Sequence, residues 1–142
     1  MATSSTANCQ DPSISTIIKE IDKSVNKINN QKKILLSRCD SIADFYGKKV
    51  YKCWNYYFTD TTQKDVCKIA ISWNGFAEWL YYYDKNKVIK SQRNRLLHGK
   101  EQMKWSIYFK EDKEIYIKGY MDRIRGDEVE EAYYFLNSNF YR

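Results

Sequence analysis

The segment Val66–Tyr83, with the sequence VCKIAISWNGFAEWLYYY, contains the clearest fold signal in the chain. Asn74-Gly75 separates two runs of apolar, β-branched and aromatic residues. An Asn-Gly pair in this position is typical of the type I′ turn of a two-residue β-hairpin loop. We therefore predict a hairpin with one apolar face and one aromatic and basic face. The predicted cross-strand pairs are Trp73–Phe76, Ile71–Glu78, Ile69–Leu80 and Cys67–Tyr82.

Two further stretches are typical of antiparallel strands. Residues 49–58 are aromatic and β-branched with polar breaks, and residues 104–120 have the pattern of a second hairpin around the loop 111–113. Residues 87–97 have a weaker pattern that allows one more strand. Together these stretches predict an antiparallel β-meander of five or six strands. The predicted pairs of the second hairpin are Lys110–Glu114, Phe109–Ile115, Ile107–Ile117 and Trp105–Gly119.

Before these strands, apolar residues recur at alternating spacings of four and three residues from Ile14 to Tyr46, with Lys32 in one position of the seam. Asp11-Pro12 is a typical helix start, and Gly47 is a typical helix end. The heptad spacing therefore predicts one long helix that associates with a partner helix. The residues expected to mediate this association are Ile14, Ile18, Ile21, Val25, Ile28, Leu35, Cys39 and Ile42.

A continuous helix of this extent would be about 50 Å long, which is more than a small domain covers. We therefore expect a coiled coil, most simply a homodimer, although the helix of a different protein would fit the same seam. In an alternative interpretation Asn29-Asn30 forms a turn, and residues 13–28 fold back on residues 32–46 as a helical hairpin. The unbroken heptad phase favours the continuous helix.

The C-terminal region predicts a short helix, because an acidic stretch at residues 127–131 precedes an apolar stripe at helical spacing. The expected fold class is α+β: a long N-terminal helix, an antiparallel β-meander and a short C-terminal helix. The expected organisation is a disordered tail at 1–10, a helical segment at 11–46 and a single α+β domain at 47–142.

The chain of 142 residues has a net charge of +6, and the charge is concentrated. Six cations and no acid lie between Lys85 and Lys100, so this window attracts anionic partners better than the same charge would if it were scattered. No apolar run is long enough to span a bilayer, and the first residues lack the features of a secretory signal peptide. We therefore expect an intracellular protein, cytoplasmic or nuclear.

The residue patterns that would support an enzyme mechanism are weak. His98 is the single histidine, and no phosphate-binding loop, dinucleotide-binding or zinc-protease motif is present. The four cysteines lack metal-site spacing, so we expect buried free thiols, with a Cys53–Cys67 bridge as an open alternative. The sequence accordingly favours a non-enzymatic protein that needs no metal or cofactor.

Basic and aromatic residues together favour nucleic-acid binding, because aromatic side chains stack on unpaired bases and cations contact phosphates. We therefore predict an RNA-binding or single-stranded-DNA-binding module. One alternative is a protein–protein adaptor that contacts an acidic protein surface, and another is a module that sequesters a small nucleotide-like anion. The expected anion-binding residues are Lys85, Lys87, Lys90, Arg93, Arg95, His98, Lys100, Trp79, Tyr81, Tyr108, Tyr116 and Lys118.

Overall fold

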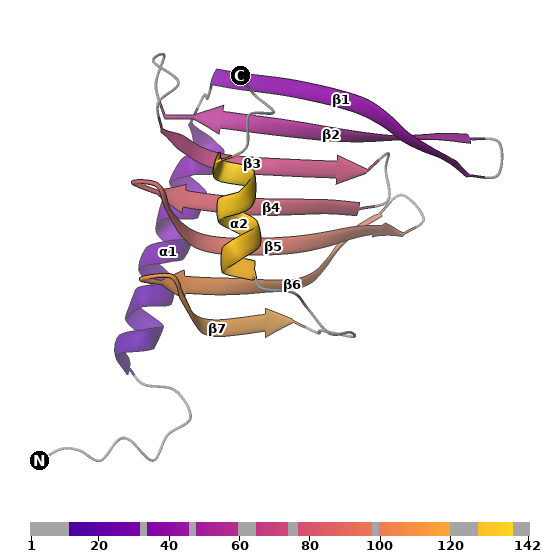
Figure 1. The fold of residues 1–142 in the computed structure, drawn as a ribbon. Helices are drawn as coiled ribbons and strands as arrows, with labels where there is room; N and C mark the ends of the chain where they lie inside the picture. The colour runs from indigo at the N-terminus through magenta and orange to yellow at the C-terminus, as the bar shows by residue number, and fades with distance from the viewer. Residues whose placement is uncertain are drawn as a thin grey trace, which may run out of the picture.

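The computed structural model describes residues 12–31, 34–45, 48–59, 65–73, 77–97, 100–119 and 128–137. Within these ranges, two helices enclose one antiparallel sheet whose strands are ordered as in the chain. Figure 1 shows α1 behind the sheet and α2 in front of it, both crossing the strands. The elements are α1 (Pro12–Asn30), β1 (Ile34–Phe45), β2 (Lys48–Phe58), β3 (Val66–Trp73), β4 (Ala77–Asp84), β5 (Lys87–Leu97), β6 (Lys100–Lys110), β7 (Lys113–Gly119) and α2 (Glu128–Asn137).

The predicted fold class was wrong in two respects. The sheet has seven strands rather than five or six, so the protein is mostly β. The N-terminal helix ends at Asn30 and residues 34–45 form β1, so neither the continuous helix nor the helical hairpin is present. None of the helices in the described ranges is long and apolar enough to cross a membrane.

The end of α1 has a physical reason. The β1 sequence, ILLSRCDSIADF, contains two Ser, two Asp and a Cys, all of which are weak helix formers. The helix also needs no second copy to cover its seam, because the sheet covers it. Its 19 residues span about 28 Å, close to the roughly 29 Å width of seven strands.

The predicted pairing of β3 with β4 was off by one residue. Ile71 pairs with Trp79 rather than with Glu78, and Trp73 pairs with Ala77. A shift of one residue moves every side chain of a strand to the other face. Here it removes Glu78 from the apolar face, and Glu78 accepts a 3.1 Å hydrogen bond from Asn94 instead. The predicted Asn74-Gly75 turn lies outside the described residues.

The second predicted hairpin is correct away from its turn. Trp105 pairs with Gly119 and Ile107 pairs with Ile117, as expected. The loop is shorter than predicted, because Glu111 and Asp112 both have positive φ, as a two-residue type I′ turn requires. Phe109 consequently pairs with Glu114, and a bulge follows. Lys85 and Asn86 form an equivalent positive-φ turn between β4 and β5.

Each face of the sheet has its own apolar cluster. The face under α2 contains the larger cluster, which includes Ile69, Tyr81 and Ile107 from the sheet and Phe135 from α2. The face under α1 contains the smaller cluster, which Ile21 and Val25 of α1 complete. Because both faces are covered, most of the strand aromatics belong to the core.

Candidate functional site

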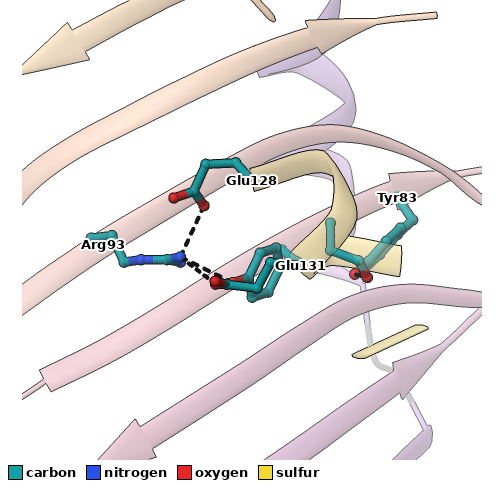
Figure 2. Close-up of polar contacts among 6 residues, drawn as sticks. Tyr83, Arg93, Glu128 and Glu131 are labelled. Atoms are coloured by element: carbon teal, nitrogen blue, oxygen red, sulfur yellow. Dashed lines mark hydrogen bonds and ion pairs between the residues drawn. The ribbon is translucent and has the colours of Figure 1, made fainter. Parts of the chain in front are cut away.

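Among the described residues, the buried charges Arg93 and Glu128 lie where α2 begins over β5. Arg93 is 7% exposed and Glu128 is 3% exposed. The Arg93 Nη2 atom lies 2.9 Å from Glu128 Oε2 and 2.6 Å from Glu131 Oε1, and it donates a 3.0 Å hydrogen bond to the Tyr81 hydroxyl. Figure 2 shows the Arg93 side chain between the two carboxylates. Two acids therefore neutralise this cation, which also fixes the start of α2.

Aromatic rings surround the same guanidinium. The Arg93 Cζ atom lies 4.0 Å from the ring centre of Trp79, 5.0 Å from that of Trp105 and 5.2 Å from that of Tyr81. Cations over ring faces are stabilised most strongly when water is excluded. Arg93 is thus a structural cation that aligns the tryptophans of β4 and β6.

Tyrosine hydroxyls dock both helices on the sheet. The Tyr83 hydroxyl donates a 2.6 Å hydrogen bond to the Ala132 carbonyl, and the Tyr81 hydroxyl bonds Glu131. On the other face, the Tyr108 hydroxyl donates a 2.8 Å hydrogen bond to Asp22 of α1. Burial raises the pKa of Tyr81, Tyr83 and Tyr108 above its ordinary value. These phenols therefore stay protonated when an exposed tyrosine would ionise.

Beyond α2, one end of the same face carries a partly exposed group of side chains that we call the tryptophan surface. Cross-strand pairing places four of its residues in one row across the sheet. Lys52 pairs with Trp73, Trp73 pairs with Ala77, and Ala77 pairs with Arg95. Trp79 lies in the next row, and its ring centre is 4.6 Å from that of Trp73. The surface consists of Lys52, Trp73, Ala77, Trp79 and Arg95.

The electrostatics of the tryptophan surface favour an anionic aromatic ligand. Lys52 Nζ lies 4.9 Å from the ring centres of both Trp54 and Trp73. Burial lowers the pKa of Lys52, and the nearby Glu131 carboxylate partly opposes that change. Arg95 is exposed at the other end of the row. Ala77, which has a small side chain, lies between Trp73 and Arg95 in the row, so the surface combines flat rings with two cations.

The structure disperses the predicted basic segment. Lys85 lies in the β4–β5 turn, and Lys87 pairs with Asp112 at 3.5 Å. Lys90 faces α1, 3.3 Å from Asp22 and over the Tyr108 ring, whereas Arg93 faces α2. His98 and the side chain of Lys100 lie outside the described residues. The cations between Lys85 and Arg95 therefore do not form one continuous tract.

The predicted aromatic platform is also divided between the two faces. Trp79 and Tyr81 lie under or beside α2, and Tyr81 is fully buried. Tyr108 is buried under α1, with Tyr116 beside it and exposed. Lys118, which pairs with Ser106, is exposed on β7. Only Trp79 and Arg95 of the predicted binding residues belong to the tryptophan surface.

Lys52 and Trp73 were missed by the sequence analysis. Trp73 was assigned to the opposite face from Trp79, because the two-residue loop sets the wrong register. Lys52 was not singled out, although it lies two residues before Trp54 and therefore on the same strand face. A three-residue β3–β4 loop would have placed Trp73, Ala77 and Trp79 together.

The residues of the predicted helix seam have different environments. Ile21 and Val25 are buried against the sheet, with Ile18 and Ile28 packed beside them. Ile14 is half-buried, and Leu35 is 49% exposed on β1. The structure does not describe the side chain of Ile42. The sheet thus covers the central part of the seam within one chain.

Two cysteines were predicted wrongly. Cys39 and Cys53 are cross-strand partners in β1 and β2 and form a disulfide. Cys67 is buried and not disulfide-bonded, as expected. In the described ranges, no group of three or more His, Cys, Asp or Glu side chains could hold a metal ion.

A pocket of about 330 Å³ lies between α1 and the turn ends of the strands. Its lining includes Lys85, Lys87 and Lys110, but also Glu20, Asp84 and Glu111. The three cations are balanced by three acids, so this pocket does not favour an anion. The tryptophan surface is therefore the better candidate for a binding site.

Compared with protein families, characterised proteins and solved structures, the chain matches none.

Proposed function

We propose that this protein is a non-enzymatic module that binds single-stranded nucleic acid, RNA or DNA, on the tryptophan surface. The observation that carries the proposal is the contact of Lys52 with the rings of Trp54 and Trp73, beside the partly exposed Trp79. Aromatic rings next to cations can stack on bases and contact phosphates at the same time.

The ring contacts provide the base-binding part of the proposal. Trp73 and Trp79 are both partly exposed, and the tight packing of Trp79 on Arg93 fixes its position. A ring that is already held in place loses little conformational entropy when a base stacks on it. Each stacked base contributes on the order of 1–3 kcal/mol.

The phosphate-binding part belongs to Lys52 and Arg95. These two cations flank the row that contains Trp73 and Ala77. Arg93 is not a phosphate ligand in this proposal, since Glu128 and Glu131 already neutralise it. This assigns different roles to Arg93 and Arg95, which are two residues apart on the same strand.

The experiment is a fluorescence anisotropy titration of labelled single-stranded oligonucleotides at several salt concentrations. Replacing Lys52 and Arg95 together by Ala should reduce the salt slope by about 1.4, because each phosphate contact on a single strand contributes about 0.7. Trp73→Ala should weaken binding roughly tenfold through lost stacking.

The matched control replaces Lys85 and Lys113 by Ala. Lys85 lies in the β4–β5 turn and Lys113 is the first residue of β7, and both are exposed at the opposite end of the strands. Their removal changes the net charge by the same amount. An equal loss of salt slope in this control would contradict the proposed site. Absence of binding by the wild-type protein at low salt would overturn the function and favour a protein–protein adaptor, whose aromatic contacts depend little on salt.

An intracellular location is part of this proposal. The reducing cytosol would keep Cys39 and Cys53 as thiols, so β1 would be held there by its backbone pairing with β2, the hydrogen bond from Ser37 to Asn55 and the packing of Leu36 on the core. In an oxidising compartment the disulfide would add a covalent link between the same strands.

A further inference from the structure

The last strand of the sheet, β7, has an accessible edge. In the described ranges β7 pairs with β6 alone, and the outer backbone groups of such an edge can pair with another strand. Tyr116 and Ile117 are each 38% exposed. The bulge lies between Glu114 and Tyr116, and Gly119 has a positive φ of 101°. The backbone is therefore regular over residues 116–118, where an added strand could continue the sheet.

We infer that β7 pairs antiparallel with β7 of a second copy of this chain, about a twofold axis at Ile117. Antiparallel pairing of a strand with its own copy is an isologous contact, in which the same surface contributes from both sides. The two sheets then form one continuous sheet. This inference goes beyond the proposed function and does not depend on it.

The faces of β7 determine which register fits. Tyr116 pairs with Tyr108 and Lys118 pairs with Ser106, so both side chains face α1, whereas Ile117 pairs with Ile107 and faces α2. Directly opposed residues of an antiparallel pair share a face. With the axis at Ile117, this residue contacts its own copy, and Tyr116 lies opposite Lys118 of the partner subunit. The twofold symmetry repeats this pair on the other side of the axis. The pairing therefore joins apolar with apolar and an aromatic ring with a cation.

Neighbouring registers fit less well. An axis at Tyr116 would oppose Glu114 and the partner's Lys118, but the bulge has turned Glu114 toward the α2 face, because it pairs with Phe109. An axis at Lys118 would oppose two lysines, which is destabilising. The face pattern and the charges therefore select the register centred on Ile117.

The helix on the α1 face leaves room for an added strand. Asp22 contacts Lys90 of β5 and Tyr108 of β6, and Pro12 lies ten residues, or about 15 Å, further toward the N-terminus. Since β7 is only about 5 Å beyond β6, the first turns of α1 extend past the edge, as Figure 1 shows. Ile17 shares a pocket with Lys110 and Glu111, so α1 crosses near the turn end of β7. The twofold axis would place the copy's helix at the other end, where the two do not collide.

Sedimentation velocity between about 1 and 100 µM tests the inference with variants at the axis. Ile117→Lys and Ile117→Glu each place two like charges opposite one another, so each variant alone should dimerise about tenfold more weakly, or not at all. An equimolar mixture of the two variants should form a heterodimer, because the charges are then opposite. Leu35→Lys, at the exposed edge strand β1, is the matched control and should leave the dimer intact.

Three other outcomes would overturn the inference. A wild-type chain that is monomeric throughout the concentration range shows that β7 does not self-associate. A dimer that survives Ile117→Lys, or dissociates with Leu35→Lys, uses another surface. Variants that dissociate alone and stay monomeric when mixed exclude Ile117 from the axis, and the mixture also controls for folding, since an unfolded variant could not be rescued.

Discussion

Arg93 joins the start of α2 to strand β5 through two ion pairs. Its charge is buried between Glu128 and Glu131, and its guanidinium packs against Trp79 and Trp105. A buried ion pair adds little net stability compared with an apolar replacement of the whole cluster. Removal of one partner, however, leaves an uncompensated charge in the interior, and this is strongly destabilising.

We therefore predict that Arg93→Met lowers the free energy of unfolding by about 3–5 kcal/mol, because the Glu128 carboxylate is then buried without a cation. Arg95→Met, two residues away and exposed, should change it by less than about 0.5 kcal/mol. Guanidinium-induced unfolding measures both values. Equal effects of the two substitutions would show that the Arg93 charge is not buried as described.

At the level of elements, the helix α1 explains what local patterns can and cannot predict. The strands β3 and β4, β6 and β7, and the helix α2 follow from alternation, turn residues and an acidic helix start. The end of α1 does not, because the spacing from Leu35 to Ile42 fits a heptad seam, whereas this segment pairs with β2, the next strand of the chain, and is itself a strand. The tryptophan surface was missed for a similar reason. It depends on the register of β3 against β4, and the two-residue loop predicted from Asn74-Gly75 gave the wrong register.

Two substitutions in the predicted seam distinguish the docked helix from a continuous coiled coil. Ile21→Ala should lower the free energy of unfolding by about 2–5 kcal/mol, because Ile21 is buried between α1 and the sheet. Leu35→Ala should change it by less than about 0.5 kcal/mol, because Leu35 is 49% exposed. A coiled coil would place both residues in equivalent core positions, so similar losses in chemical unfolding would contradict the observed fold.

For the whole molecule, burial of tyrosines on both faces of the sheet makes stability depend on alkaline pH. The pKa of Tyr81 and of Tyr83 is raised in the folded protein by burial, so the unfolded chain loses these protons first. Stability from these groups is complete below about pH 10 and decreases as the pH rises above it. The pKa values of Lys52 and Lys68 are lowered in the folded protein, so these two groups make stability rise with pH. Their effect ends at about pH 10.5, where lysines of the unfolded chain lose their protons.

We predict that the free energy of unfolding falls between pH 10 and 12 by up to about 1.4 kcal/mol per pH unit for each buried tyrosine. Tyr83→Phe should reduce this slope by the contribution of one tyrosine, up to about 1.4 kcal/mol per pH unit. The substitution also removes the hydrogen bond to the Ala132 carbonyl. Urea unfolding at pH 9, 11 and 12, with tyrosine ionisation followed by absorbance, provides the values. A stability that is constant over this range would contradict the burial of these phenols.

The two proposals are also connected at this scale. A twofold axis through β7 would leave both tryptophan surfaces on the same side of the continuous sheet, because opposed strands share their faces. An oligonucleotide long enough to reach both surfaces would then bind more tightly through effective concentration.

The central claim is that the tryptophan surface binds single-stranded nucleic acid, and the anisotropy titration at about 50 and 200 mM salt tests it most directly. We predict binding of single-stranded RNA or DNA in preference to duplex DNA, with an affinity that falls with salt and a salt slope that decreases when Lys52 and Arg95 are replaced. Absence of binding at 50 mM salt, or a slope unchanged by these two substitutions, would contradict the claim.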